Sequence, residues 1–299
     1  MPPASDDSDR ARRTGPTSGI LVTGGTGKTG RELVKLLQNS GVSVRVASRN
    51  PAVDDPNTVQ FDWDDPLTHA AALDGQDRVY LVPPVQSSDP MPSVVPFLEE
   101  AQRRGVRKVV LLGSAIPLAA KAPELAARVQ ALPGGVVLRP SGFMQNFLSP
   151  HPLGLRIQRS GEIRTAAGEG RVGWIDARDI AATAAAILLS DRDLTPADQR
   201  DYLLTGPQAL SYPETASIIT AGTGRPIRVI QTDPQQQATD LRAVGIPAEF
   251  AEILARADAG VRAGREDEIS TAVRDLTGQS PRTFAEFVDE HVARWAAVA

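Results

Sequence analysis

Short apolar runs alternate with helical patterns along the first half of the chain. The apolar runs that predict strands lie at 19–23, 42–48, 59–62, 78–82, 108–112 and 136–140. The helical patterns between them lie at 31–37, 64–75 and 93–104. Strands that are apolar throughout and alternate with helices are typical of a parallel sheet covered on both faces. The pattern therefore predicts an α/β fold with a doubly wound parallel sheet.

The regular alternation ends near residue 150. Beyond it the sequence predicts helices at 177–189 and 212–222, short strands at 201–204 and 226–230, and mostly helical structure from 238 onward. The two short strands flank the helix at 212–222. We expect these pieces to form a smaller, mostly helical lobe that closes over the main sheet.

The turn after the first apolar run contains three evenly spaced glycines, Gly24, Gly27 and Gly30, and a helical pattern follows at once. In such a unit the first glycine allows a tight turn, the second admits phosphates close to the backbone, and the third lets the helix pack against the strand. Free N–H groups and the helix dipole then face the anion. This order predicts a pyrophosphate site in a Rossmann-type domain.

The same turn also resembles the end of the phosphate loop of nucleotide hydrolases, through Gly27, Lys28 and Thr29. That loop needs an earlier glycine at the position that Val22 occupies, so an ATPase is excluded.

The chain is expected to have three parts. Residues 1–18 are polar and rich in Pro, Ser, Asp and Arg, which predicts a disordered tail. Residues 19–150 are expected to form an NAD(P)-binding Rossmann domain, and residues 151–299 the remaining Rossmann elements plus a substrate lobe. The tail lacks the apolar core of a signal peptide, and no apolar run is long enough to span a membrane. We therefore expect a cytoplasmic protein without membrane partners.

Composition narrows the possible functions of the 299 residues. The hydrophobic fraction of 41% supports a sizeable core, and a net charge of −4 argues against a nucleic-acid surface. There are no cysteines, so disulfides and thiol catalysis are excluded. The three histidines are far apart in sequence, and no metal site is expected.

The end of the second strand favours NADP(H) over NAD(H). NAD-selective folds of this type usually place an acidic residue there to bind the ribose 2′-hydroxyl. This chain has Ser48 and Arg49 instead, and a guanidinium can bind a 2′-phosphate through two hydrogen bonds. The alternative is that Arg49 is only a solvated surface residue. Asp62, after the third strand, can contact the adenine amino group or merely cap a turn.

Together these features resemble the NmrA-like branch of the atypical short-chain dehydrogenase/reductases over nearly the whole chain after the tail. The matching segments are 20–30, 46–51, 61–64, 109–115, 138–147 and 174–181. The strings at 24–30 and 77–84 look closest to the ergot-alkaloid reductases. This resemblance implies a Rossmann domain, a nicotinamide cofactor and a small substrate lobe, but it does not imply one reaction. Members include isoflavone-type, quinone and imine reductases and catalytically silent redox sensors.

From the motifs and the resemblance we expect cofactor contacts from Gly24, Thr26, Gly27, Lys28, Thr29, Gly30, Ser48, Arg49, Asp62, Trp63, Val82, Pro83 and Ser114. We expect a substrate pocket lined by Pro84, Phe143, Met144, Phe147 and Trp174. The alternative for the three residues that follow Pro140 is core packing at the start of a helix. Asn146 is expected to be structural, and Asp176 is expected to cap the helix that begins at Ala177.

The usual acid of short-chain reductases, a Tyr-x-x-x-Lys pair, is absent. The tyrosines are Tyr80, Tyr202 and Tyr212, and none has a lysine four residues on. The proton for a reduction must therefore come from water, from the substrate or from Lys121, whose spacing is similar to that of the lysine in isoflavone-type reductases. Ser114 can bond a substrate carbonyl or cap a turn. Lys121 and Ser114 are thus the candidate catalytic residues, and Lys121 can equally be a solvated surface lysine.

The sequence favours an NADPH-dependent reductase of a small, largely apolar secondary metabolite, with hydride transfer to a C=N, C=C or C=O bond. The alternatives are a non-catalytic sensor of NADP(H) that docks on a regulator, and a non-redox enzyme on the same fold. No nucleic acid is expected as a partner. The oligomeric state is left open, with a homodimer as one candidate.

Overall fold

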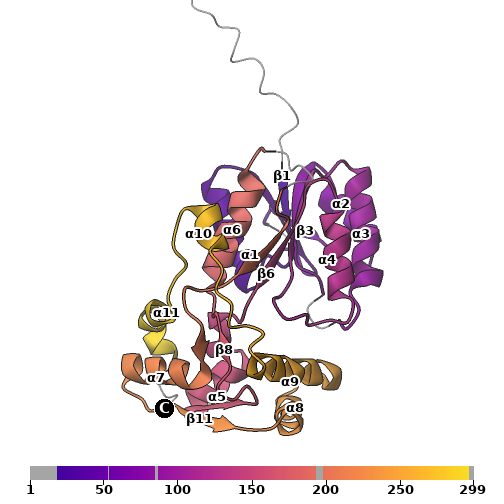
Figure 1. Ribbon diagram of the computed structural model, residues 1–299. Helices are drawn as coiled ribbons and strands as arrows, with labels where there is room; N and C mark the ends of the chain where they lie inside the picture. The colour runs from indigo at the N-terminus through magenta and orange to yellow at the C-terminus, as the bar shows by residue number, and fades with distance from the viewer. Residues whose placement is uncertain (1–18, 53, 85–86, 193–197, 296–299) are drawn as a thin grey trace, which may run out of the picture.

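The first lobe of the molecule is built on a seven-stranded parallel sheet (Figure 1). The computed structural model describes residues 19–52, 54–84, 87–192 and 198–295. In spatial order the strands are β3 (Thr58–Gln60), β2 (Ser43–Ser48), β1 (Gly19–Val22), β4 (Gln76–Leu81), β5 (Lys108–Leu112), β6 (Gly135–Pro140) and β9 (Asp201–Leu204). Every pairing is parallel. The strand order reverses between β1 and β4, and this switch point is where ligands bind in doubly wound folds.

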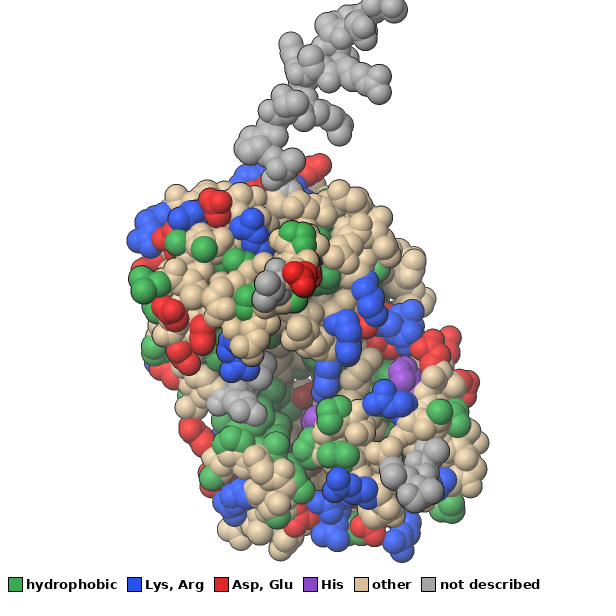
Figure 2. All heavy atoms as spheres, turned by 180° about the vertical axis from the view of Figure 1, so that it is seen from behind, with side chains coloured by type: hydrophobic (Ala, Val, Ile, Leu, Met, Phe, Trp, Pro, Cys, Tyr) green, Lys and Arg blue, Asp and Glu red, His purple; other side chains and the backbone are tan. Residues whose placement is uncertain are grey.

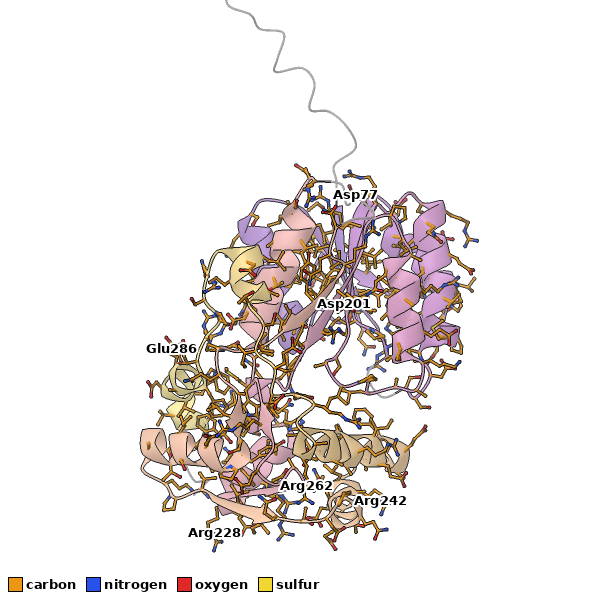
Figure 3. All side chains as sticks on the ribbon, in the orientation of Figure 1. Asp77, Asp201, Arg228, Arg242, Arg262 and Glu286 are labelled. Atoms are coloured by element: carbon orange, nitrogen blue, oxygen red, sulfur yellow. The ribbon has the colours of Figure 1, made fainter. Side chains whose placement is uncertain are left out.

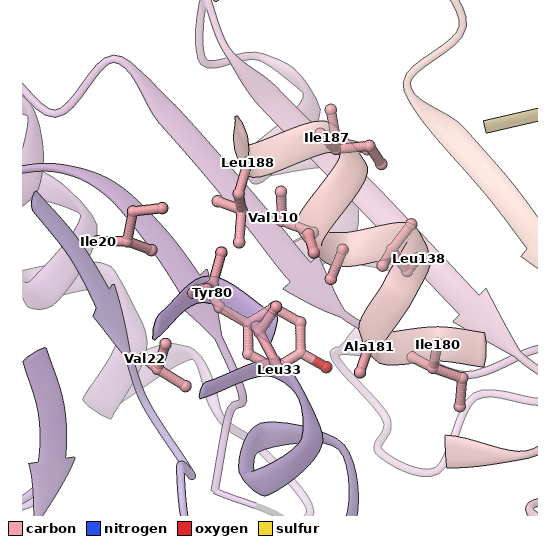
Figure 4. Packing of buried hydrophobic residues seen from close by; sticks show 14 of the residues in the cluster. Ile20, Val22, Leu33, Tyr80, Val110, Leu138, Ile180, Ala181, Ile187 and Leu188 are labelled. Carbon is pink, nitrogen blue, oxygen red and sulfur yellow. The ribbon is translucent and has the colours of Figure 1, made fainter. Parts of the chain in front are cut away.

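Helices cover both faces of this sheet and shield the apolar strands from water. One face carries α1 (Lys28–Asn39), α6 (Ala177–Leu189) and α10 (Ala272–Thr277). The other carries α2 (Leu67–Leu73), α3 (Met91–Arg103) and α4 (Ala122–Gln130). Figure 4 shows α6 lying over the sheet, where Ile180 and Leu188 pack in one cluster with Val110 and Leu138. The carboxyl ends of the strands point toward the second lobe (Figure 1).

The second lobe has its own aromatic core and two small sheets. Its helices are α5 (Pro152–Ser160), α7 (Tyr212–Thr223), α8 (Pro234–Ala243), α9 (Ala248–Arg262) and α11 (Phe284–His291), with the 3-10 helices η1 (Met144–Phe147) and η2 (Val292–Trp295). Its strands are β7 (Glu162–Thr165), β8 (Arg171–Val172), β10 (Leu210–Ser211) and β11 (Arg228–Gln231). Figure 3 places Arg228, Arg242 and Arg262 on this lobe and Asp77 at the far end of the main sheet.

Most expected elements are present, but one helix and one strand belong to a different lobe. The expectation that the helix at 177–189 and the strand at 201–204 belong to the smaller lobe is wrong, because α6 packs on the main sheet and β9 pairs with β6 at the edge of that sheet. Helices α4 and α5 were not expected. The proposed tail, 1–18, lies outside the described residues. Within the described part of the chain, no helix combines the length and apolar character that a membrane crossing requires.

Two buried cations hold the carboxyl end of α6 against the amino ends of the central strands. The Lys108 amine donates to the carbonyls of Ile187 at 3.1 Å and Ser190 at 2.6 Å. The Arg78 guanidinium donates to the carbonyl of Leu188 and to Asp191. The last carbonyls of a helix have no partner within the helix, and the dipole there favours positive charge. These bonds therefore fix α6 on the sheet.

We predict that Lys108→Met lowers the free energy of unfolding by about 2–4 kcal/mol, since an apolar side chain of similar length leaves buried carbonyls without donors. Urea unfolding of the purified protein measures this loss. Lys35→Met is the matched control, because Lys35 is exposed and, among the described residues, its one ion-pair partner is Glu32 on the surface of α1. The control should change stability by less than about 0.5 kcal/mol. Equal effects of the two substitutions would contradict the role given to Lys108.

Candidate dinucleotide and substrate site

The loop between β1 and α1 has the tight geometry that its glycines predict. Gly24 adopts φ +65°, and its carbonyl accepts a hydrogen bond from the Gly27 amide at 2.9 Å. A Cβ on Gly30 would lie 2.3 Å from the Gly24 carbonyl oxygen, which no real side chain tolerates. The first turn of α1 is therefore packed directly against the loop.

The amides of this loop are available to bind an anion. Among the described residues, no hydrogen bond partner is found for the backbone N–H groups of Thr26, Lys28 or Thr29. They lie at or just before the amino end of the 12-residue helix α1, where the dipole favours negative charge. Thr26 and Gly27 are exposed. The residues present thus fit the pyrophosphate of a dinucleotide.

Side chains beneath the loop attach it to β4. The Thr23 hydroxyl accepts a bond from the Val82 amide at 2.7 Å, and the Tyr80 hydroxyl donates to Thr29 Oγ1 at 3.0 Å. Tyr80 is fully buried, and this burial raises the pKa of its phenol. Its hydroxyl therefore supports the loop as a neutral hydrogen-bonding group.

The residues expected around the adenosine half lie at the ends of β2 and β3. Ser48 Oγ accepts a bond from the Asn50 amide, so it shapes the turn that presents Arg49. Arg49 is exposed and forms no ion pair with another described residue. The Asp62 carboxylate accepts a bond from the Asp64 amide, as a turn-capping residue does. Trp63 packs edge-on against Phe61 in an aromatic cluster. Their contacts with a cofactor stay predictions.

Figure 2 shows a hollow between the two lobes, with hydrophobic side chains on its wall and acidic and histidine atoms inside it. Lys28, the first residue of α1, crosses from the loop to the second lobe. Its amine donates to Asn146 Oδ1 at 2.6 Å and lies 6.0 Å from the centre of the Phe143 ring. Asn146 thus connects the loop at 24–30, called the phosphate loop from here on, to the segment after β6. The sequence did not indicate this contact.

Burial shifts the pKa of two groups beside this contact. It lowers the pKa of the Lys28 amine to about 8. It also lowers the pKa of His151 to about 3, with a further contribution from the positive charge of Lys28. His151 Nδ1 accepts a bond from the Leu153 amide and caps α5. Because His151 is neutral, it does not compensate the positive charge of Lys28, which stays available to a bound anion.

The two candidate catalytic residues of the sequence occupy different surroundings. Ser114 is half-buried after β5, and within the described residues its hydroxyl has no hydrogen bond, so it is free to bind a ligand. Lys121 is exposed and its amine donates to Glu124 at 2.8 Å. That bond raises the pKa of Lys121, which makes it a weaker acid. A catalytic role stays a prediction for both.

The residues expected to line the substrate pocket differ in how much of their side-chain surface is exposed. Pro84 and Phe143 are half-buried at the ends of β4 and β6 and have surface to offer a ligand. Met144 and Phe147 are completely buried and Trp174 is 4% exposed. The Phe147 and Trp174 rings meet edge-on, 4.8 Å apart, in the core of the second lobe. These three side chains therefore pack in the core of the second lobe, as the alternative of core packing expects for Met144 and Phe147, and a part in a substrate pocket stays a prediction.

The capping role expected of Asp176 is confirmed, because its carboxylate accepts a bond from the Arg178 amide at the start of α6. A further acid, Glu266, was not expected at the site. It lies between α9 and α10, and its Oε2 accepts a bond from the Gly142 amide at 3.2 Å. Gly142 follows the carboxyl end of β6 by two residues. The Glu266 carboxyl therefore lies near the carboxyl ends of the strands, where ligands bind in such folds.

The chain is similar over most of its length to known proteins. A family profile described as NAD(P)H-binding matches residues 24–191. The uncharacterized oxidoreductase YesF of Bacillus subtilis is 40% identical over 280 residues, which cover 92% of this chain and 96% of that protein. Agroclavine dehydrogenase of Claviceps fusiformis is 35% identical over 294 residues, covering 92% and 98%. The NADPH-dependent quinone oxidoreductase QOR2 of Escherichia coli, in complex with NADPH, has the same fold, with a TM-score of 0.76, 23% identity, and coverage of 91% and 99%.

The lowered pKa of Lys28 predicts a pH dependence of stability. Between pH 8 and 10.5 the unfolded chain binds more protons at Lys28 than the folded one, so its contribution to stability rises with pH in this window. Lys28→Met removes the cost of burying the charge at pH 7, and its advantage over the natural protein should shrink by about 1 kcal/mol by pH 10.

Urea unfolding of both proteins at several pH values measures the difference. Lys35→Met, on the exposed side of the same helix, serves as control and should show no such trend. An advantage of Lys28→Met that stays constant with pH would mean that the Lys28 amine is not desolvated.

Proposed function

The chain belongs to the NAD(P)H-binding family, and we propose that it is an NADPH-dependent reductase of a small, largely apolar metabolite. One observation carries this proposal: the loop at 24–30 has available amides, and its Lys28 amine donates to Asn146 on the second lobe and lies 6.0 Å from the apolar ring of Phe143. A dinucleotide on this loop would extend along the carboxyl ends of the strands into that hollow. The names of the two relatives given above, an oxidoreductase and a dehydrogenase, support redox chemistry.

Each part of the site has a role in this reaction. When bound, the cofactor supplies a hydride. The amides of residues 26–29 would hold its pyrophosphate, and Phe143 and Pro84 would bind the apolar part of the substrate. The Ser114 hydroxyl can donate a hydrogen bond to a substrate carbonyl. The second lobe excludes water, and catalysis depends mainly on holding the two reactants close together in the right orientation.

The preference for NADP(H) rests on Arg49. Its guanidinium is exposed at the carboxyl end of β2, where a dinucleotide places the 2′ position of its adenine ribose. No carboxylate stands at that strand end to bind a ribose hydroxyl or to repel a phosphate. Two charged hydrogen bonds from Arg49 would favour the phosphorylated cofactor.

The reducible bond is a C=N, C=C or C=O bond. Without a Tyr-x-x-x-Lys pair, an iminium ion or an activated enone suits the site best, because these acceptors need the least help from an acid. Agroclavine dehydrogenase, which is 35% identical to this chain over 294 residues, supports a substrate from secondary metabolism.

We predict that Arg49→Ala weakens NADPH binding by about 10- to 100-fold and NADH binding by less than threefold, since only the former carries the phosphate that the guanidinium would contact. Fluorescence titration with each cofactor measures both constants. Arg103→Ala is the matched control, because Arg103 is an exposed arginine of α3 that pairs with Glu100. Equal losses for NADPH and NADH would overturn the phosphate assignment.

A second prediction separates a reductase from a sensor that binds the cofactor without turning it over. With a panel of quinones, cyclic imines, enones and cationic dyes, the protein should oxidise NADPH, which the loss of nicotinamide absorbance at saturating acceptor measures. Gly30→Ala is the control for a site that cannot form, because its Cβ would collide with the Gly24 carbonyl. Tight NADPH binding with no turnover on any acceptor would favour the sensor.

A further inference from the structure

Reduction of a neutral acceptor needs a proton as well as a hydride, and this chain lacks the usual tyrosine. The three tyrosines of the chain are not placed to donate this proton. Tyr80 is buried beneath the phosphate loop and donates to Thr29, and Tyr202 donates to the Gln199 carbonyl. Tyr212 packs against the core of the second lobe, and burial raises the pKa of its phenol. The proton source must be sought among the other ionisable groups near the carboxyl ends of the strands.

Glu266 lies in the short segment between α9 and α10, which crosses from the second lobe back to the first and passes the carboxyl ends of the strands. Its carboxyl Oε2 accepts from the Gly142 amide, and its backbone carbonyl accepts from the Gly173 amide at 3.1 Å. Four residues later, the Ser270 amide donates to Thr205 Oγ1 at 3.0 Å, just beyond β9. The segment thus spans the carboxyl ends of β6 and β9 on its way from α9 to α10 (Figure 1).

The surroundings of this carboxyl favour its protonated form. Burial raises the pKa of Glu266 to about 7, and the negative charge of Asp258 on α9 acts in the same direction. The bond from the Gly142 amide opposes both effects in part. The Asp258 carboxylate accepts hydrogen bonds from the Thr165 hydroxyl, the Gln237 side-chain amide and the Ala166 backbone amide. Tyr212 on α7 is the other titratable group that interacts with Glu266, and it stays neutral in this range. An acid that titrates near pH 7 suits proton transfer at neutral pH.

The remaining protic groups of the site are less suited. His151 is uncharged at neutral pH, and its Nδ1 is an acceptor for the Leu153 amide. The Lys28 amine is bonded to Asn146 and stands beside the loop that would hold the pyrophosphate, where it would balance that charge. Lys121 is exposed and bonded to Glu124. Glu266 alone of these combines a place at the strand ends with a dissociable proton near pH 7.

We propose that Glu266 is the general acid that protonates neutral acceptors in the hollow, an inference that rests on the proposed reductase function. The carbon of the reducible bond gains the hydride with its electron pair, and the cofactor is oxidised. The heteroatom or enolate oxygen gains the proton as the Glu266 O–H bond breaks. Glu266 is left as a carboxylate and takes a proton back from water. A cationic acceptor needs the hydride only, because hydride addition already gives a neutral product.

The first test requires no turnover. In the cofactor-free protein labelled with [13C]glutamate at the carboxyl carbon, one resonance should titrate near pH 7 and be missing from Glu266→Gln. This variant keeps an oxygen to accept from the Gly142 amide, so the segment should stay in place. Glu268→Gln, two residues along in the same segment and exposed, is the matched control and should retain the resonance. A Glu266 resonance that titrates at the ordinary position of glutamate, near 4.5, would overturn the proposal.

The second test compares a neutral quinone with a cationic triarylmethane dye or an iminium salt, all at saturating NADPH. Glu266→Gln should lower the ratio of quinone turnover to cation turnover about 100-fold at pH 6. Quinone turnover by the natural protein should fall above pH 7, and the variant should lose this dependence. Glu266→Asp should restore part of the ratio. A ratio that changes less than threefold in Glu266→Gln shows that another group is the acid.

The two tests also distinguish failure of this inference from failure of the proposed function. A natural protein that reduces neither class of acceptor overturns the reductase, and the acid role with it. A natural protein that reduces both classes, with an unchanged ratio in the variant, overturns only the role of Glu266.

Discussion

The close contact between α1 and the loop before it is the constraint on which the rest of the site depends. Main-chain amides, rather than long side chains, would bind the anion, so their positions must be set by packing. Gly30 lets the helix touch the Gly24 carbonyl, and the Tyr80 hydroxyl bonds Thr29 from below. The first contact packs α1 on the loop, and the second attaches α1 to β4, at the point where the strand order reverses. The apolar core under the sheet thereby fixes the geometry of a polar site.

The second lobe returns to the first through contacts that bury ionisable groups. Asp179 on α6 accepts from the Arg282 amide at 2.8 Å, and burial raises the pKa of its carboxyl to about 6. Glu266 accepts a bond from the Gly142 amide in the same way. A buried acid with a raised pKa makes the folded state less stable as pH rises through its titration. Each of these two acids therefore destabilises the folded state in its charged form.

Elements that depend on local sequence patterns were predicted from the sequence. Features that depend on contacts between distant parts of the chain were not. The loop at 24–30 and the strands β1, β4 and β5 follow from glycine spacing and apolar runs, and they were found. Strand β9 was assigned to the wrong lobe because its pairing with β6 joins segments far apart in sequence. Spacing alone also drew attention to Lys121, whose amine turns out to be exposed and paired with Glu124. Glu266 stands in a run of charged residues with no pattern to mark it, and only the folded chain brings it to Gly142.

The positive charge of Lys28 is surrounded by uncharged groups. Lys28 is partly desolvated, and its partners Asn146 and His151 are both uncharged, so its positive charge has no counterion there among the described residues. A pyrophosphate on the adjacent amides would provide one and would raise the pKa of the amine again. Glu266, farther along the strand ends, can stay protonated near neutral pH and would then add no negative charge beside the cofactor. In the proposed reaction the Lys28 cation would serve binding and the Glu266 carboxyl would serve proton transfer, because the surroundings of each group set its pKa separately.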